Sequence, residues 1–191
     1  NGCSNSDSVT VFVIQTSFSF YGTIYNQAHD ATLNNGFVYL LEYDTALTQF
    51  ATIDSVALSG VNGDCVLNNH PTGQYIILFR PDTSVYPYAV PTYYGDTTLW
   101  ADAQVINLIS DTFGIDISTR EVPLLSGNGF ISGFIQYGIG TGKTGTGTVV
   151  PFGDPVPGID VSLEQIPGGI VKHTETDNSG FYSFSNLPLN S

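Results

Sequence analysis

The residues best suited to chemistry in this chain are its histidines, its cysteines and its scattered carboxylates. His29, His70 and His173 lie far apart and form no His-Glu-x-x-His pair or comparable ligand spacing. Cys3 and Cys65 also lack a metal-ligand spacing, and neither a cysteine–histidine constellation nor a Gly-x-Ser-x-Gly elbow is visible. The sequence therefore indicates no catalytic residue and predicts a protein that is not an enzyme.

Calcium is the metal that the carboxylates could hold. Asp177 and Asn178 stand together in a short polar turn, and Asp111 with Asp116 forms a second candidate pair. A calcium site needs several oxygen ligands from one loop, and the EF-hand-like Asp-x-Asp-x-Asp-Gly pattern is missing. These four residues are the calcium candidates, and no other cofactor is expected.

The two cysteines allow two interpretations. A disulfide between Cys3 and Cys65 would suit a secreted chain. Alternatively, Cys65 is a core residue, because it takes a strand position that holds Tyr182 in a second copy of the same sequence pattern.

Aromatic residues gather in the segment 80–104. Such a strip in a secreted β-protein is typical of a sugar-stacking platform. Alternatively, the rings cover apolar strands: Val38 and Leu40 are predicted to face outward, and 75–79 is apolar on both faces. That interpretation predicts that the tryptophan and most of the tyrosines are buried. The platform candidates are Tyr86, Tyr88, Tyr93, Tyr94 and Trp100.

The composition predicts an all-β fold. Glycine (21), proline (10), tyrosine (11) and phenylalanine (12) are frequent, and few stretches repeat at the helical period, which is typical of short strands joined by turns. Only 4 Lys+Arg oppose 17 Asp+Glu, so a chain of net charge -13 would be repelled by nucleic acid and by anionic lipid. No run approaches the roughly 18 apolar residues of a membrane helix, so we expect no membrane insertion.

Two copies of one unit organise the chain. In the second copy, the turn residues 177–180 precede a strand at 181–185, and a weaker version of this pattern lies at 61–71. We therefore predict an N-terminal strand at 1–15, a first β-sandwich unit at 16–125 that contains the aromatic-rich insertion 80–104, and a second unit at 126–191.

The second copy resembles the carboxypeptidase-regulatory-like family of transthyretin-like (prealbumin-like) modules. The resemblance implies two tandem Ig-like/transthyretin-like antiparallel β-sandwiches, in which the motif residues build turns and core rather than an active site. The residues that carry it are Gly158, Val161, Leu163, Thr174, Thr176, Asp177, Ser179, Gly180, Tyr182, Phe184, Leu187 and Pro188.

The start of the chain, Asn1-Gly2-Cys3 followed by Asp7-Ser8-Val9-Thr10-Val11, resembles the last strand of the PKD-like repeats of large bacterial surface proteins. The two resemblances imply an extracellular or cell-surface location on a bacterium. They imply a non-catalytic structural or adhesive module pair of a multidomain surface protein or filament, whose partners are neighbouring modules of the same or an identical chain. The alternative is an accessory or carbohydrate-binding module of a secreted hydrolase.

The second unit is expected to lack at least one core strand, because its copy of the pattern stops at the counterpart of Gln74. Unpaired apolar edges recruit other chains. Either the protein continues beyond this sequence, or another chain supplies the strand by β-strand addition, for which the segment Asp7–Gln15 is the candidate donor.

Overall fold

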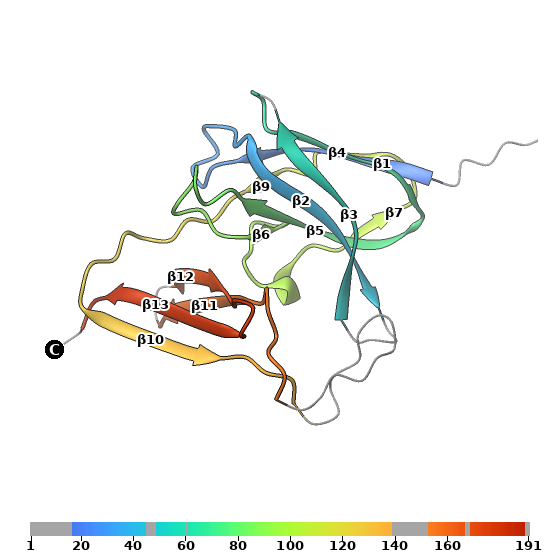
Figure 1. The fold of residues 1–191 in the computed structure, drawn as a ribbon. Coiled ribbons are helices and arrows are strands. Elements are labelled where there is room, and N and C mark those ends of the chain that lie inside the picture. Colours follow the sequence, from blue (N-terminus) through green and yellow to red (C-terminus); the bar gives the residue numbers. More distant parts are fainter. Residues whose placement is uncertain (1–16, 45–48, 60, 139–152, 167–168, 190–191) are drawn as a thin grey trace, which may run out of the picture.

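The structure is a computed structural model that describes residues 17–44, 49–59, 61–138, 153–166 and 169–189. Strands and their connections make up nearly all of it, so the chain is all-β as its composition predicted (Figure 1). Cys3 and the predicted strand Asp7–Gln15 lie outside the described residues. The elements are β1 (Ser17–Tyr25), β2 (Asn35–Asp44), β3 (Gln49–Ser59), β4 (Asp64–Pro71), β5 (Gly73–Pro81), β6 (Thr92–Tyr93), the 3₁₀ helix η1 (Trp100–Asp102), β7 (Ile106–Leu108), β8 (Thr112–Phe113), β9 (Ile117–Ser118), β10 (Gly129–Phe134), β11 (Asp160–Gln165), β12 (Gly169–Glu175) and β13 (Phe181–Leu187).

Strands β1 to β9 form two facing sheets, which we call unit one. One sheet has the order β4-β1-β8, with β9 also paired to β1, and the other has the order β3-β2-β5-β6, with β7 also paired to β5. The long ladders are antiparallel, whereas the two-residue pairings of β1 with β8 and β9 are parallel. Buried side chains from both sheets meet in one core, so unit one is a β-sandwich.

The faces of β2 are the reverse of those predicted from the repeat. Val38 and Leu40 were expected to face outward, yet both are fully buried in the core between the sheets, while Phe37 is 49% exposed. The prediction came from aligning Val38 with Asp160, an exposed residue of β11. Because side chains alternate along a strand, an error of one residue in such an alignment exchanges the two faces.

The segment 80–104 covers the outer face of β5, as predicted. The inward residues of β5 belong to the core, and the outward residues Ile76 and Leu78 form a second buried cluster. Tyr93 and Ala103, which both belong to the insertion, pack against this cluster. The apolar character of both faces of β5 is thus accounted for by one inner and one outer layer of side chains.

A segment that contains β8 and β9 runs along the edge of β1. The Asp111 carboxylate accepts a hydrogen bond from the Ser19 N–H at 2.9 Å, and the Asp116 carboxylate accepts one from the Thr23 N–H at 2.9 Å. A Cβ at Gly22 would lie 1.9 Å from a carbonyl oxygen of this segment, so the close approach requires glycine at this position.

Strands β10 to β13 form the second group, which we call unit two. Here β10 pairs with β13 and β11 pairs with β12, both antiparallel, and no ladder joins this group to unit one among the described residues. Val161 and Leu163 are half-buried while their neighbours on β11 are exposed, as expected of a strand with one side facing solvent. Whether the boundaries 16–125 and 126–191 delimit independent domains stays a prediction. Within the described ranges, no helix has the length and apolar character that spanning a membrane would need.

The assignment of strand faces in unit one can be tested on two phenylalanines. Phe79 is fully buried in the core, so Phe79→Ala should lower the free energy of unfolding by about 3–5 kcal/mol. The matched control Phe37→Ala removes a half-exposed ring on the neighbouring strand and should cost about 1 kcal/mol. Chemical unfolding of both variants measures the difference, and equal losses would contradict the assignment.

Candidate functional site

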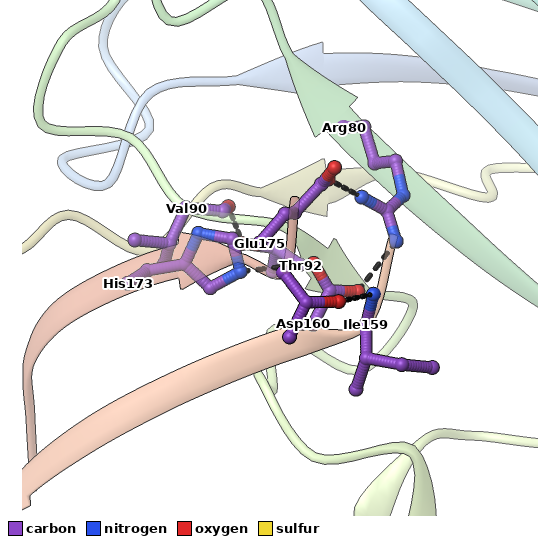
Figure 2. A network of polar contacts seen from close by, with 8 residues as sticks. Arg80, Val90, Thr92, Ile159, Asp160, His173 and Glu175 are labelled. Atoms are coloured by element: carbon purple, nitrogen blue, oxygen red, sulfur yellow. Dashed lines mark hydrogen bonds and ion pairs between the residues drawn. The ribbon is translucent and has the colours of Figure 1, made fainter. Parts of the chain in front are cut away.

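The structure brings one charged cluster together where the two units meet. Arg80, near the end of β5, donates hydrogen bonds from its guanidinium to the carboxylates of Asp160 and Glu175 (Figure 2). The Nε2 atom of His173 donates to the other oxygen of Asp160 at 2.9 Å. Asp160 and Glu175 are directly opposite in the β11–β12 ladder, so both side chains leave the same face of that hairpin and reach Arg80. We call these four residues the Arg80 cluster.

Solvent access limits what the Arg80 cluster adds to stability. The side chains of Arg80, Asp160 and Glu175 are 26%, 31% and 48% exposed. Ion pairs as open as these contribute about 1 kcal/mol or less. The planar guanidinium held between two carboxylates nevertheless restricts the direction of approach. The cluster is therefore a weak contribution to folding stability and a directional contact between the units.

Hollows adjoin the Arg80 cluster, and the junction between the units is loosely packed. Cavities of about 300, 180 and 470 Å³ all have His173 in their lining. The one of about 300 Å³, which we call the inter-unit cleft, is lined mostly by aromatic and aliphatic side chains from unit one and mostly by polar side chains, with Ile170, from unit two. Its lining includes Tyr93, Leu99, Trp100, Asp160, Ser162 and Glu164.

The Tyr93 phenol in the inter-unit cleft lies near charges of both signs. Burial raises the pKa of the Tyr93 phenol, and the Asp160 carboxylate raises it further, while Arg80 acts in the opposite direction. The carboxylate therefore outweighs the guanidinium at this ring.

The five rings proposed as a ligand platform do not form one row. Tyr86 and Tyr94 pack against the core of unit one, and Tyr93 packs against the outer cluster of β5. Tyr88 and Trp100 are 45% and 56% exposed, so the expectation that the tryptophan is buried was wrong. The reason is that other residues of the insertion already cover the outer face of β5.

Trp100 instead separates the inter-unit cleft from a second groove. Its ring meets Phe50 edge-on with a centroid distance of 5.3 Å, and Phe50 meets Tyr43 in the same way at 5.3 Å. These rings line a groove of about 370 Å³, which we call the aromatic groove. Trp100 is the first residue of the 3₁₀ helix η1.

The other two histidines lie at separate places in unit one. The Nδ1 atom of His29 is 2.8 Å from the hydroxyl of Ser118 in an exposed loop. His70 is buried, and its Nε2 atom is 3.1 Å from a carboxylate oxygen of Asp54. Neither is near the Arg80 cluster in the hydrogen bonds that the described residues form.

Cys65 lies in the core of unit one. Burial, reinforced by the Asp116 and Asp64 carboxylates, raises the pKa of its thiol to about 11, so the thiol is almost entirely protonated at neutral pH. The core interpretation of Cys65 is confirmed, and the disulfide to Cys3 stays a prediction because Cys3 lies outside the described residues.

The carboxylates of Asp111, Asp116 and Asp177 accept hydrogen bonds from backbone N–H groups, and the fourth calcium candidate, Asn178, is the neighbour of Asp177 in the chain. The Asp177 carboxylate accepts hydrogen bonds from the N–H groups of Ser179 and Phe181 at 2.8 and 3.0 Å and from the Ser179 hydroxyl at 2.6 Å, and Asn178 lies within this turn. Asp111 and Asp116 bind β1 as described above. In the part of the chain that the structure describes, no group of three or more His, Cys, Asp or Glu is placed to hold a metal. Calcium binding stays a prediction.

Sequence reasoning did not find the Arg80 cluster. The available signal was that Arg80 is one of only 4 basic residues in a chain with 17 acidic ones, and that polar residues alternate along β11. That the acidic face of this hairpin would meet Arg80, a residue 80 positions away from Asp160, follows from the arrangement of the units and not from any local pattern.

The fold and the junction define an all-β chain of sandwich-like units whose polar side chains meet between the units. No family model and no curated protein matches it. Two solved structures are similar: the TIE protein of Bacillus anthracis, at 14% identity and a TM-score of 0.32 over 88% of this chain, and a streptococcal ancillary pilin, at 13% identity and a TM-score of 0.35 over 92% of this chain. The matches span 26% and 52% of those chains, so this chain corresponds to about a quarter of the first and half of the second. TM-scores this low assign neither a family nor a function.

The turn at Asp177 gives a pH-dependent prediction. Hydrogen bonds from Ser179 and Phe181 lower the pKa of Asp177 below its ordinary value, so folding favours the charged form. The stabilisation is complete above the unfolded pKa of about 3.9 and is lost as the pH falls through the lower folded value. Asp177→Ala should lower the melting temperature at neutral pH and should change it little at the lowest pH.

The control is Asp102→Ala, which removes an exposed carboxylate with no hydrogen bond among the described residues. Thermal unfolding followed by circular dichroism over a range of pH compares the two. A stability deficit of Asp177→Ala that is the same at every pH would refute the assigned role of the carboxylate.

Proposed function

We propose that this chain is a non-catalytic pair of structural modules from an extracellular surface protein, in which the Arg80 cluster holds the two units in one relative orientation. The observation that carries the proposal is that a single guanidinium joins the end of β5 in unit one to two adjacent strands of unit two. A spacer needs a defined geometry between its modules, and this contact supplies one.

The placement of the ionisable side chains supports the non-catalytic part of the proposal. Each described histidine is engaged with a different partner in a different part of the fold: His29 with Ser118, His70 with Asp54 and His173 with Asp160. Cys65 is buried in the core of unit one. A nucleophile, a base and an orienting group that converge on one cavity are what a hydrolase would require.

The resemblance of the 158–188 pattern to transthyretin-like modules supports a location at the bacterial surface. In that setting the pair would keep a binding region away from the cell and dock on neighbouring modules of the same or an identical chain.

The orientation can be measured in solution. Arg80→Gln removes the guanidinium from the junction, so we expect a larger maximum dimension in small-angle scattering than for the wild-type protein. Raising the salt concentration from about 0.05 M to about 0.5 M should move the wild type in the same direction, because screening weakens exposed ion pairs.

Arg120→Gln is the matched control, since Arg120 donates from Nε to the backbone carbonyl of Asp96 within unit one. It should leave the scattering curve unchanged. If Arg80→Gln and Arg120→Gln both scatter like the wild type, the Arg80 cluster does not fix the orientation, and the structural proposal loses its support.

The carbohydrate-binding alternative has one observation in its favour, which is the exposed Trp100 at the aromatic groove. If the chain is such a module, a glycan array should detect binding that Trp100→Ala abolishes. Tyr88→Ala, which removes another exposed ring that does not line this groove, should leave the signal intact. Binding that Trp100→Ala does not change would exclude the aromatic groove as a sugar site.

A further inference from the structure

The inter-unit cleft has the composition of a site for an organic cation. Tyr93, Leu99 and Trp100 from the insertion of unit one lie on one side. On the other side stand Asp160, Ser162 and Glu164, which are alternate residues of β11 and therefore lie on the same face of that strand. A ligand in the cleft would contact aromatic rings and carboxylates at once.

The charges around the cleft are not balanced. Asp160, Glu164 and Glu175 contribute three negative charges, and Arg80 contributes one positive charge, so the carboxylates outnumber the guanidinium by two. Arg80 is directed to the first and third of these carboxylates. The Glu164 side chain is exposed and has no hydrogen bond or ion pair among the described residues. One carboxylate is therefore left for a ligand.

We propose that the inter-unit cleft binds a lysine or arginine side chain presented by an extended segment of a partner protein. Glu164 pairs with the ammonium or guanidinium, and the rings of Trp100 and Tyr93 attract the same cation through their π faces. The Asp160 carboxylate, which lines the same cleft, attracts a cation in the same sense. An anionic ligand would be repelled, and a neutral saccharide would leave the charge of Glu164 unbalanced.

The size of the cleft suits one side chain rather than a folded domain. Its volume of about 300 Å³ is at the lower end of the range of about 300–1,000 Å³ for ligand pockets. Both units contribute to its lining, so the site exists only in the docked arrangement. The inference thus goes beyond the structural role proposed above and rests on the orientation that the Arg80 cluster maintains.

Trp100 is the only tryptophan of the chain and lines both the inter-unit cleft and the aromatic groove, so its fluorescence responds to a ligand in either, and the Glu164 variant assigns the signal to the cleft. The probe is a trilysine peptide, acetylated at its N-terminus and amidated at its C-terminus, titrated at about 0.05 M salt. We expect a saturable change in Trp100 fluorescence that weakens with added salt. Glu164→Gln should weaken the affinity by roughly fivefold, as for one partly exposed ion pair.

Glu42→Gln is the matched control, because it removes the same charge from β2, which does not line the cleft. It should retain the wild-type affinity, and the analogue of the peptide with acetylated lysine side chains should not bind. The proposal is overturned if trilysine gives no saturable signal, if both glutamine variants weaken it equally, or if the acetylated analogue or a neutral hexasaccharide acts as well as trilysine.

Scattering from the same samples separates this inference from the structural one. A docked wild-type chain that fails to bind trilysine overturns the cation site alone. A chain whose units are undocked overturns both, because the cleft would not form.

Discussion

Strand β5 is apolar on both of its faces, and this constraint determines where much of the rest of unit one must lie. Its inward side chains pack in the core between the sheets, and Ile76 and Leu78 on the outer face also need cover. Burial of an apolar side chain of this size is worth about 1.5–3 kcal/mol, which favours a chain that folds back over the strand. The insertion 80–104 provides that cover, so its position is a packing requirement of β5.

The same packing places the charged and aromatic residues of the junction. Arg80 follows the buried part of β5 directly, so it emerges at the edge of the sandwich. The returning insertion then presents Leu99 and Trp100 toward the face of β11. Because the chain has 4 basic and 17 acidic residues, the position of one guanidinium can determine which acidic surface forms ion pairs with it. The packing of β5 therefore determines both the core of unit one and the position of the residues that contact unit two.

Local sequence patterns were sufficient for the fold class and for the strands before the insertion and after the Asp177 turn, β5 and β13. Turn chemistry predicted the Asp177 turn, where the carboxylate accepts the hydrogen bonds expected of it, and the two-faced apolar run predicted the cover over β5. Comparison between the two copies failed at Val38, because a repeat this diverged does not fix the alignment to a single residue.

Local sequence patterns could not predict the Arg80 cluster, and the reason is different. Asp160 and Glu175 are set opposite each other by the register of one hairpin, and Arg80 reaches them from another unit. Only the arrangement of the units brings these groups together. The exposure of Trp100 likewise depends on which residues of the insertion contact β5. The number of aromatic residues in the insertion does not reveal this.

The two aspartates along β1 have a consequence for how this module avoids aggregation. Unpaired N–H groups at the edge of a sheet are templates for strands of other molecules. At Ser19 and Thr23 these donors are occupied by the Asp111 and Asp116 carboxylates, and the two flanking parallel pairings occupy more of the same edge. The two carboxylates and the short strands β8 and β9 thus protect this edge of β1, although no full-length strand pairs with it. In the described part of the chain, β3 and β4 are the long strands of this sandwich that pair on one side only, so they present its longest open edges to a strand from outside.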